Sequence, residues 1–321
     1  MRDRWTEAML DGAFEEAWAV SDAVIRQRRG RSCTDLPCHL RWVWDGAPFA
    51  GRDVLVRCYH GLGDTLQFIR FVPRLSTIAR RVIVEAQMEL FPLLRSISGI
   101  SALHPLGTAL PCWDVAIESM ELPHALRLRL DDLPGPVPYL SAPGRPRSGA
   151  AHGLPRPTGA PRLRVGIVWA AGDWRRERSL PPTLLFPLAQ LPLDLVCLQL
   201  GAARRDPDAV CLLRACAMAL AETAAIAETA ALICRLDLIV TVDTMVAHLA
   251  GALGRPVWML LDADADWRWM RRRSDSPWYP TMRVLRQSQP GVWEPVVEQL
   301  LAELARVVRQ PGGERERRPP C

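Results

Sequence analysis

The sequence predicts an α/β protein with two Rossmann-like domains whose mostly parallel sheets face a central cleft. Strands and helices alternate in the first half, and the same alternation restarts in the second half after a Pro/Gly-rich stretch. A chain of 321 residues is long enough for two domains of about 150 residues each. Its 49% apolar and 23% charged residues are typical of a chain with ordinary buried cores.

In the first half, short apolar runs predict strands over 54–58, 81–85 and 114–118. Helical segments over 65–79 and 88–97 separate them, and Gly99 follows the second. Strands and helices of these lengths imply a parallel sheet covered by helices.

The alternation restarts after residue 162. The predicted strands cover 165–169, 195–199, 238–242 and 257–261, and the predicted helices cover 222–235 and 244–253. Gly254 and Pro256 end the last of these helices.

These patterns predict five regions along the chain. They are a helical N-terminal extension (1–35), a Rossmann-like domain (36–145), a linker (146–162), a second Rossmann-like domain (163–310) and a disordered tail (311–321). Ligands of parallel sheets bind beyond the carboxyl ends of the strands, so the site is expected there.

The composition excludes several classes of function. All 40 basic residues are arginines, which excludes Schiff-base lysines and a P-loop lysine. We find no basic stripe for nucleic acid, no CxxC pair and no complete calcium loop, so no metal is expected. No apolar run reaches the roughly 18 residues of a membrane span, and no signal peptide begins the chain, so a cytoplasmic protein is expected.

The first candidate motif, His60-Gly61-Leu62-Gly63-Asp64, follows the first strand. Two glycines allow a ligand to approach the backbone, and Asp64 could accept a proton from a hydroxyl group. The alternative is that Asp64 caps the next helix with Gln67 as its reciprocal partner. The third glycine of a dinucleotide fingerprint is missing.

The second motif, Asp243-Thr244, ends a strand and opens a helix. The amides of Thr244 and Met245, at the positive end of the helix dipole, form an anion site suited to a diphosphate. His248 lies one turn further on the same face. The alternative is that Thr244 only caps the helix and His248 packs against the sheet.

Two loops add further candidates. The loop after the strand at 165–169 carries cations that could neutralise the diphosphate of a donor, or that form a solvated charged loop: Arg175, Arg176 and Arg178. Trp169, which precedes this loop, is also a candidate for contact with the donor. The loop after 257–261 carries Asp266, Trp267 and Arg268, which could line the cleft on the acceptor side. Its tryptophans could stack on a sugar or a base, or they could belong to the core.

Gly61-Leu62-Gly63-Asp64-Thr65-Leu66-Gln67-Phe68, together with Val242-Asp243-Thr244 and His248-Leu249-Ala250-Gly251, resembles glycosyltransferase family 9. The similarity is to heptosyltransferase-like proteins, often linked to tetratricopeptide repeats, and covers roughly residues 40–300. The segments Arg41–Gly46, Asp266–Trp269 and Ser276–Pro280 fit the same set.

The resemblance implies a GT-B fold and an inverting transfer without a metal, with the donor in the second domain and the acceptor in the first. It assigns Asp64 as general base, and Asp243, Thr244 and His248 to the donor phosphates. The family's phosphate lysine is absent here, so an arginine of 175–178 would replace it. The implied partners are a nucleotide sugar, which is a substrate rather than a cofactor, and a glycan, lipid-linked or protein acceptor. Peripheral contact with a membrane stays open.

Three alternatives share this fold class. They are a degenerate protein that only binds a nucleotide or glycan, a nucleotide-sugar epimerase, and a nicotinamide dehydrogenase. The missing dinucleotide fingerprint disfavours the dehydrogenase.

Overall fold

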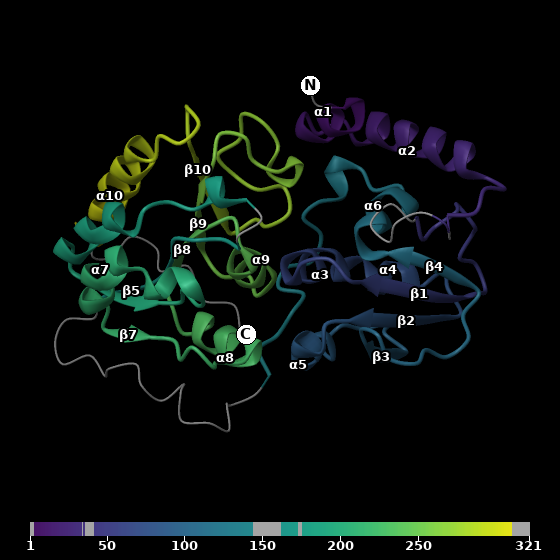
Figure 1. Ribbon diagram of the computed structural model, residues 1–321, viewed down its shortest axis with the longest axis horizontal. Coiled ribbons are helices and arrows are strands. Elements are labelled where there is room, and N and C mark those ends of the chain that lie inside the picture. Colours follow the sequence, from purple (N-terminus) through teal and green to yellow (C-terminus); the bar gives the residue numbers. More distant parts are fainter. Residues whose placement is uncertain (1–2, 34, 36–41, 144–161, 173–174, 310–321) are drawn as a thin grey trace. The chain divides into compact units, whose positions relative to one another are not determined.

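The computed structural model describes residues 3–33, 35, 42–143, 162–172 and 175–309 (Figure 1). The chain forms two compact units. The first comprises Met1–Gly135 and Asp266–Arg271, and the second comprises Pro136–Ala265 and Arg272–Cys321. A short segment from late in the sequence, Asp266–Arg271, therefore belongs to the first unit. We call it the 266–271 segment.

The first unit contains a four-stranded parallel sheet in the order β3-β2-β1-β4. Its strands are β1 (Asp53–Cys58), β2 (Arg81–Ala86), β3 (Ala102–Pro105) and β4 (Val115–Glu118). In register, Val56 of β1 lies between Val84 and Ile117, and all three side chains are fully buried. Because all strands run in one direction, their carboxyl ends meet at one edge.

Short helices connect these strands and follow the last of them. They are α3 (Leu62–Phe68), a 3-10 turn (Ile69–Phe71), α4 (Val72–Ser76), a 3-10 turn (Met88–Leu90), α5 (Phe91–Leu94), a 3-10 turn (Ser119–Glu121), α6 (Leu122–Ala125) and a 3-10 turn (Leu130–Asp132). The helix predicted over 65–79 is therefore interrupted and begins earlier. Pro73 lacks the N–H that a continuous helix would donate to the carbonyl of Ile69, which explains the interruption.

Two N-terminal helices, α1 (Arg4–Leu10) and α2 (Phe14–Arg28), pack on the first unit. Trp18 donates from Nε1 to the carbonyl of Leu128 at 2.7 Å. Asp22 accepts hydrogen bonds from Arg127 at 2.9 and 2.8 Å, and lies 2.8 Å from His124 Nε2. The helices expected in this region are confirmed, and they are part of the fold rather than a loose extension (Figure 1).

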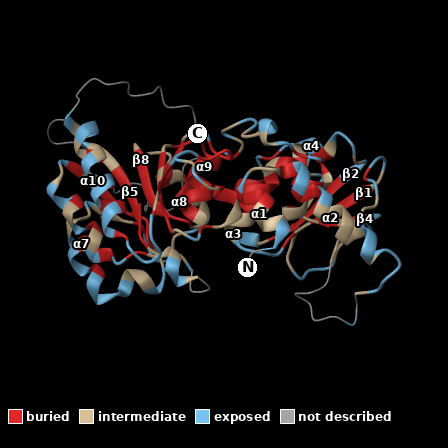
Figure 2. Cartoon of the chain, turned by 90° about the horizontal axis from the view of Figure 1, so that it is seen from above, coloured by how far each residue is buried: buried red, intermediate tan, exposed pale blue. Residues whose placement is uncertain are grey.

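The second unit contains a six-stranded parallel sheet in the order β10-β9-β8-β5-β6-β7. Its strands are β5 (Leu163–Val168), β6 (Leu193–Cys197), β7 (Met218–Ala219), β8 (Leu238–Val242), β9 (Val257–Leu261) and β10 (Met282–Arg286). The four predicted strands are all present. β8 is buried along its whole length, and Figure 2 shows β5 and β8 in the buried colour.

The helical elements of the second unit are mostly short. They are 3-10 helices at Arg176–Arg178, Pro182–Gln190, Ala202–Arg205 and Pro207–Ala209, and the helices α7 (Val210–Ala215), α8 (Ile226–Ile233), α9 (Met245–Ala252) and α10 (Glu294–Arg309). Figure 2 shows α10 with a buried and an exposed side, and Val296, Val297, Leu300 and Leu304 are its buried residues.

The sequence analysis missed β3, β7, β10, α6, α7 and α10. β3 and β7 have four and two residues, too few for an apolar run to stand out. α10 could have been predicted from the sequence, since its buried apolar residues recur at helical spacing. The predicted linker up to residue 161, and the tail, lie outside the described residues. Among the helices of the described part, none is long and apolar enough to cross a membrane.

Candidate functional site

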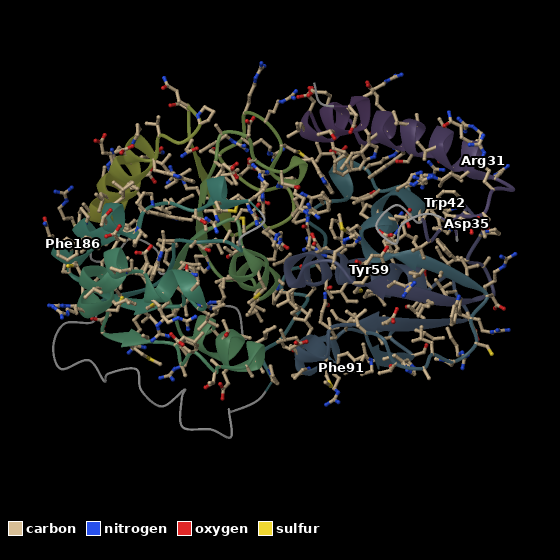
Figure 3. The ribbon with its side chains drawn as sticks, in the orientation of Figure 1. Arg31, Asp35, Trp42, Tyr59, Phe91 and Phe186 are labelled. Carbon is tan, nitrogen blue, oxygen red and sulfur yellow. The ribbon has the colours of Figure 1, made fainter. Side chains whose placement is uncertain are left out.

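The carboxyl edge of the first sheet gathers a cluster of polar side chains. Tyr59 (labelled in Figure 3) and His60 directly follow β1, and Glu118 ends the neighbouring strand β4. Tyr59 donates from its hydroxyl to Glu118 Oε1, and His60 Nε2 lies 3.0 Å from Glu118 Oε2. The Glu118 carboxylate thus contacts both residues that precede Gly61.

Hydrogen bonding shifts the pKa values in this cluster. The Glu118 carboxylate raises the pKa of His60, against the opposing effect of burial. Burial alone would raise the pKa of Glu118, but the hydrogen bonds from His60 and Tyr59 outweigh it and lower that pKa. The His60–Glu118 pair is therefore stabilised in its charged form.

Glu121 is the cluster's protonatable carboxyl group. Burial, and then the negative charge of Glu118, raise its pKa from 4.5 to about 7. One of its oxygens accepts a hydrogen bond from the Glu118 amide at 3.3 Å.

We expect Glu121→Gln to stabilise the protein at pH 8 but not at pH 4. With the carboxyl pKa raised in the folded state, its stabilising effect is complete below the unfolded value near 4.5 and is lost as pH rises through about 7. Glutamine mimics the protonated form and removes this dependence. Thermal unfolding across that pH range checks the prediction, with the exposed Glu89→Gln as control. A Tm difference that does not vary with pH contradicts it.

Asp64 is the third residue of α3 rather than its N-cap. The helix begins at Leu62 with Gly61 as N-cap, and Asp64 Oδ2 accepts a hydrogen bond from the Gly61 amide at 3.0 Å. The interpretation of Asp64 as N-cap with Gln67 as partner is therefore wrong, because extended Gly61 starts the helix three residues earlier. Gln67 is instead completely buried.

The 266–271 segment places a cationic side chain, that of Arg268, beside Asp64. Arg268 donates from Nη2 to Asp64 Oδ1 at 2.5 Å and from Nη1 to Asp266 Oδ1 at 2.7 Å. The Asp64 side chain keeps 26% of its surface exposed. The two acceptor-side groups predicted from distant motifs, around Asp64 and around Asp266, are thus in contact within the first unit.

The remaining acceptor-side candidates contribute to the helix start and to packing near Asp64. Gly61 and Gly63 lie at the start of α3, and only Gly61 has a capping role. Trp267 packs its ring against Phe68, with centroids 6.2 Å apart. These positions shape the surroundings of Asp64.

In the second unit, Asp243 follows β8 and lies buried between two basic groups. Arg178 Nη1 donates to its carbonyl at 3.2 Å and lies 3.6 Å from Oδ2. His248 Nε2 lies 3.8 Å from Oδ1, and His248 Nδ1 lies 3.0 Å from the hydroxyl of Tyr279. The Asp243 carboxylate thus lies beside both Arg178 and His248 at the carboxyl edge of the sheet.

The start of α9 has the predicted form. Thr244 is its N-cap, and Thr244 Oγ1 accepts a hydrogen bond from the Val246 amide at 3.2 Å. Met245 is the first helical residue, and His248, on the next turn, is 5% exposed. Capping by Thr244 is therefore present, and it coexists with the helix start that suits an anion.

The loop arginines divide between two environments. Arg175 donates from Nη2 to Asp262 Oδ2 at 2.6 Å and to the carbonyl of Asp264 at 2.8 Å. Burial raises the pKa of Asp262, partly opposed by Arg175. Arg176 lines a cavity of about 370 Å³. Its lining residues are Ala170, Ala171, Arg176, Ser179, Ala202, Ala203, Arg205 and Asp206.

Trp169 is a core residue rather than a ligand contact. It is 1% exposed and belongs to the apolar core of the second unit, so the expected contact with a donor is corrected. The backbone amide of Trp169 donates to Gln199 Oε1 at 3.1 Å. An apolar strand continued by Trp fills the space between sheet and helices, which accounts for its burial.

Sequence reasoning missed two residues of these clusters, Glu118 and Glu121. Glu118 ends a predicted strand, so its position was a usable signal. Glu121 gave none, since its raised pKa depends on burial in the folded chain. Tyr279 was noted only as part of Ser276–Pro280, and its contact with His248 appears only in the folded chain. Among the described residues, no group of three or more His, Cys, Asp or Glu side chains is placed to hold a metal ion.

The two units have the fold of the GT-B glycosyltransferases. The ADP-heptose LPS heptosyltransferase II of E. coli matches with a TM-score of 0.55 and 17% identity, over 80% of this chain and 99% of that chain. The glycosyl transferase family 9 structure from Veillonella parvula matches with a TM-score of 0.50 and 12% identity, over 84% and 92%. The predicted fold class is confirmed.

Residues 196–285 match the model of glycosyltransferase family 9 (heptosyltransferase). Protein FlbA of Caulobacter vibrioides is 36% identical over 70 residues, 22% of this chain and 11% of FlbA. This chain thus spans a small part of that relative. The resemblance to family 9, the heptosyltransferase family, is confirmed over residues 196–285.

Proposed function

We propose that this chain transfers a sugar from a nucleotide-sugar donor to a hydroxyl acceptor by an inverting displacement. The acceptor hydroxyl loses its proton to Asp64 and forms a bond to the anomeric carbon. The bond from that carbon to the diphosphate breaks, and the nucleoside diphosphate leaves. The observation that carries the proposal is the arrangement of Arg178 and His248 around Asp243 at the start of α9.

The second unit is the proposed donor site. A departing diphosphate is stabilised by cations, by hydrogen-bond donors and by helix-start amides, which Arg178, His248 and Met245 would respectively supply. Two buried atoms at the same sheet edge have no hydrogen-bond partner among the described residues: Asp262 Oδ1 and Gln287 Nε2. Polar groups of a bound donor would satisfy them, since buried polar atoms are normally hydrogen-bonded. ADP-heptose, the donor in the name of the E. coli heptosyltransferase II, is the first to test.

The first unit is the proposed acceptor side. A carboxylate offers about four lone-pair positions, and Gly61 and Arg268 occupy two of those of Asp64. The other positions leave Asp64 able to accept the proton of a hydroxyl group. His60 and Glu118 provide further hydrogen-bonding groups for a polyhydroxylated acceptor.

We expect ADP or another nucleoside diphosphate to raise the Tm of the protein, and His248→Ala and Arg178→Ala to weaken that binding. Loss of a hydrogen bond to a charged group typically costs about 1.5–3 kcal/mol, or roughly a tenfold or larger rise in Kd. Isothermal titration with ADP, UDP and GDP measures it. Exposed Arg214→Ala, in the same unit, is the charge-matched control.

Three outcomes separate the alternatives. Nucleoside diphosphate release together with a glycosylated acceptor supports transfer. Binding without turnover over a panel of acceptors indicates a degenerate binding protein, and an isomerised free sugar indicates an epimerase. No stabilisation by any nucleoside diphosphate or nucleotide sugar overturns the proposal.

A further inference from the structure

The 266–271 segment reaches Asp64 through one arginine. Arg268 is 7% exposed, and its guanidinium bridges the carboxylates of Asp64 and Asp266. The guanidinium carbon lies 4.7 Å from the ring centroid of Trp267 and 5.3 Å from that of Phe68. A planar cation between two rings and two carboxylates has little freedom to move. Arg268 therefore fixes where Asp64 Oδ1 lies.

The segment itself is held by α1. The Arg271 amide donates to the carbonyl of Leu10 at 2.8 Å. The Arg271 side chain donates from Nη2 to Glu7 and from Nη1 to Asp11, the latter at 3.2 Å. The Trp5 ring meets Trp267 edge-on, with centroids 5.3 Å apart. Trp267 and Arg271, near the two ends of the segment, thus both contact α1, and Arg271 also contacts Asp11, the residue after it.

The backbone of the segment requires such support. Met270, inside the segment, has a φ value of 47°, and Arg272, the residue directly after it, has a φ value of 55°. This left-handed conformation costs free energy for residues other than glycine. Met270 is 3% exposed and packs beside Gly12, where an added Cβ would lie 3.5 Å from its sulfur. Such a conformation persists only where surrounding contacts fix it.

We propose that α1 positions the carboxylate of Asp64 through the 266–271 segment, with Arg268 as the positioning residue. This inference rests on the proposed function for its effect on the rate, but not for its effect on structure. It assigns a role to α1, which holds a late part of the sequence against the proposed base. A small displacement of a positioned group can lower a rate by about a hundredfold. The effect of α1 on the position of Asp64 should therefore be measurable as a change in rate.

The test compares Trp5→Ala and the double variant Glu7→Gln/Asp11→Asn with a control that removes two equivalent charges, Glu15→Gln/Glu16→Gln on α2. Hydrogen–deuterium exchange of the peptide over 60–68 is the deciding measurement. We expect faster exchange there in both α1 variants and not in the control, with the peptide over 53–58 unchanged. Equal exchange over 60–68 in all variants overturns the inference.

Transfer kinetics give the size of the effect. We expect the α1 variants to lower kcat about tenfold with donor KM unchanged, and Arg268→Ala to lower it about a hundredfold, with partial recovery on adding guanidinium. Trp5→Ala should cost nothing further in the Arg268→Ala background. Additive losses overturn the inference. If the wild-type protein transfers no sugar, the proposed function falls, and exchange over 60–68 alone decides the inference.

Discussion

Asp64→Asn is expected to lower kcat for sugar transfer about 10²–10⁴-fold, the usual contribution of a general base. Asparagine has nearly the same shape and can still accept the hydrogen bond that Asp64 accepts from Gly61 at 3.0 Å. The fold of α3 should therefore persist. The affinity for the donor should not change, because the residues proposed to bind its phosphates belong to the second unit. Initial rates at saturating donor, with a nucleoside diphosphate titration, measure both quantities.

Two controls keep this result interpretable. Asp131→Asn makes the same chemical change at an exposed position of the first unit and should keep full activity. Thermal unfolding of Asp64→Asn tests whether loss of the ion pair with Arg268 has unfolded the unit. Near wild-type transfer by a folded Asp64→Asn protein removes Asp64 from the role of base.

Gly251→Ala is expected to destabilise the protein, although alanine is the better helix former. In an open helix the change would stabilise by about 1 kcal/mol. Here an added Cβ would lie 2.5 Å from Cγ and Cδ1 of Tyr279, whose ring is completely buried. Overpacking of this kind costs typically 1–3 kcal/mol, so packing outweighs propensity. Each kcal/mol should lower Tm by about 2–4 °C in a unit of this size.

Gly251→Ala should also weaken binding at the proposed donor site. The Tyr279 hydroxyl lies 3.0 Å from His248 Nδ1, so a displaced ring releases the imidazole that flanks Asp243. Weaker nucleoside diphosphate binding should accompany the lower Tm. Gly172→Ala is the control, since nothing lies within 4 Å of its added Cβ. A higher Tm for Gly251→Ala would show that helix propensity wins and that the ring moves freely.

The carboxyl edges of the two sheets show how far sequence patterns reach. Strand ends at Cys58 and Val242 were predictable because buried parallel strands are apolar runs and polar residues follow them. Asp64 and Asp243 were therefore found as candidates. Their partners were not, since an ion pair such as Asp64–Arg268 joins positions 204 residues apart. No local pattern records which distant side chain completes a charged pair.

The sequence by itself determined the α/β class, two parallel sheets and the helix start at Thr244, because hydrophobic periodicity and capping act over a few residues. Tertiary structure alone decided that Trp169 belongs to the core. It also decided that the 266–271 segment belongs with the first unit, where α1 and α3 hold it. These outcomes depend on which surfaces are buried together, and burial is a property of the whole folded chain.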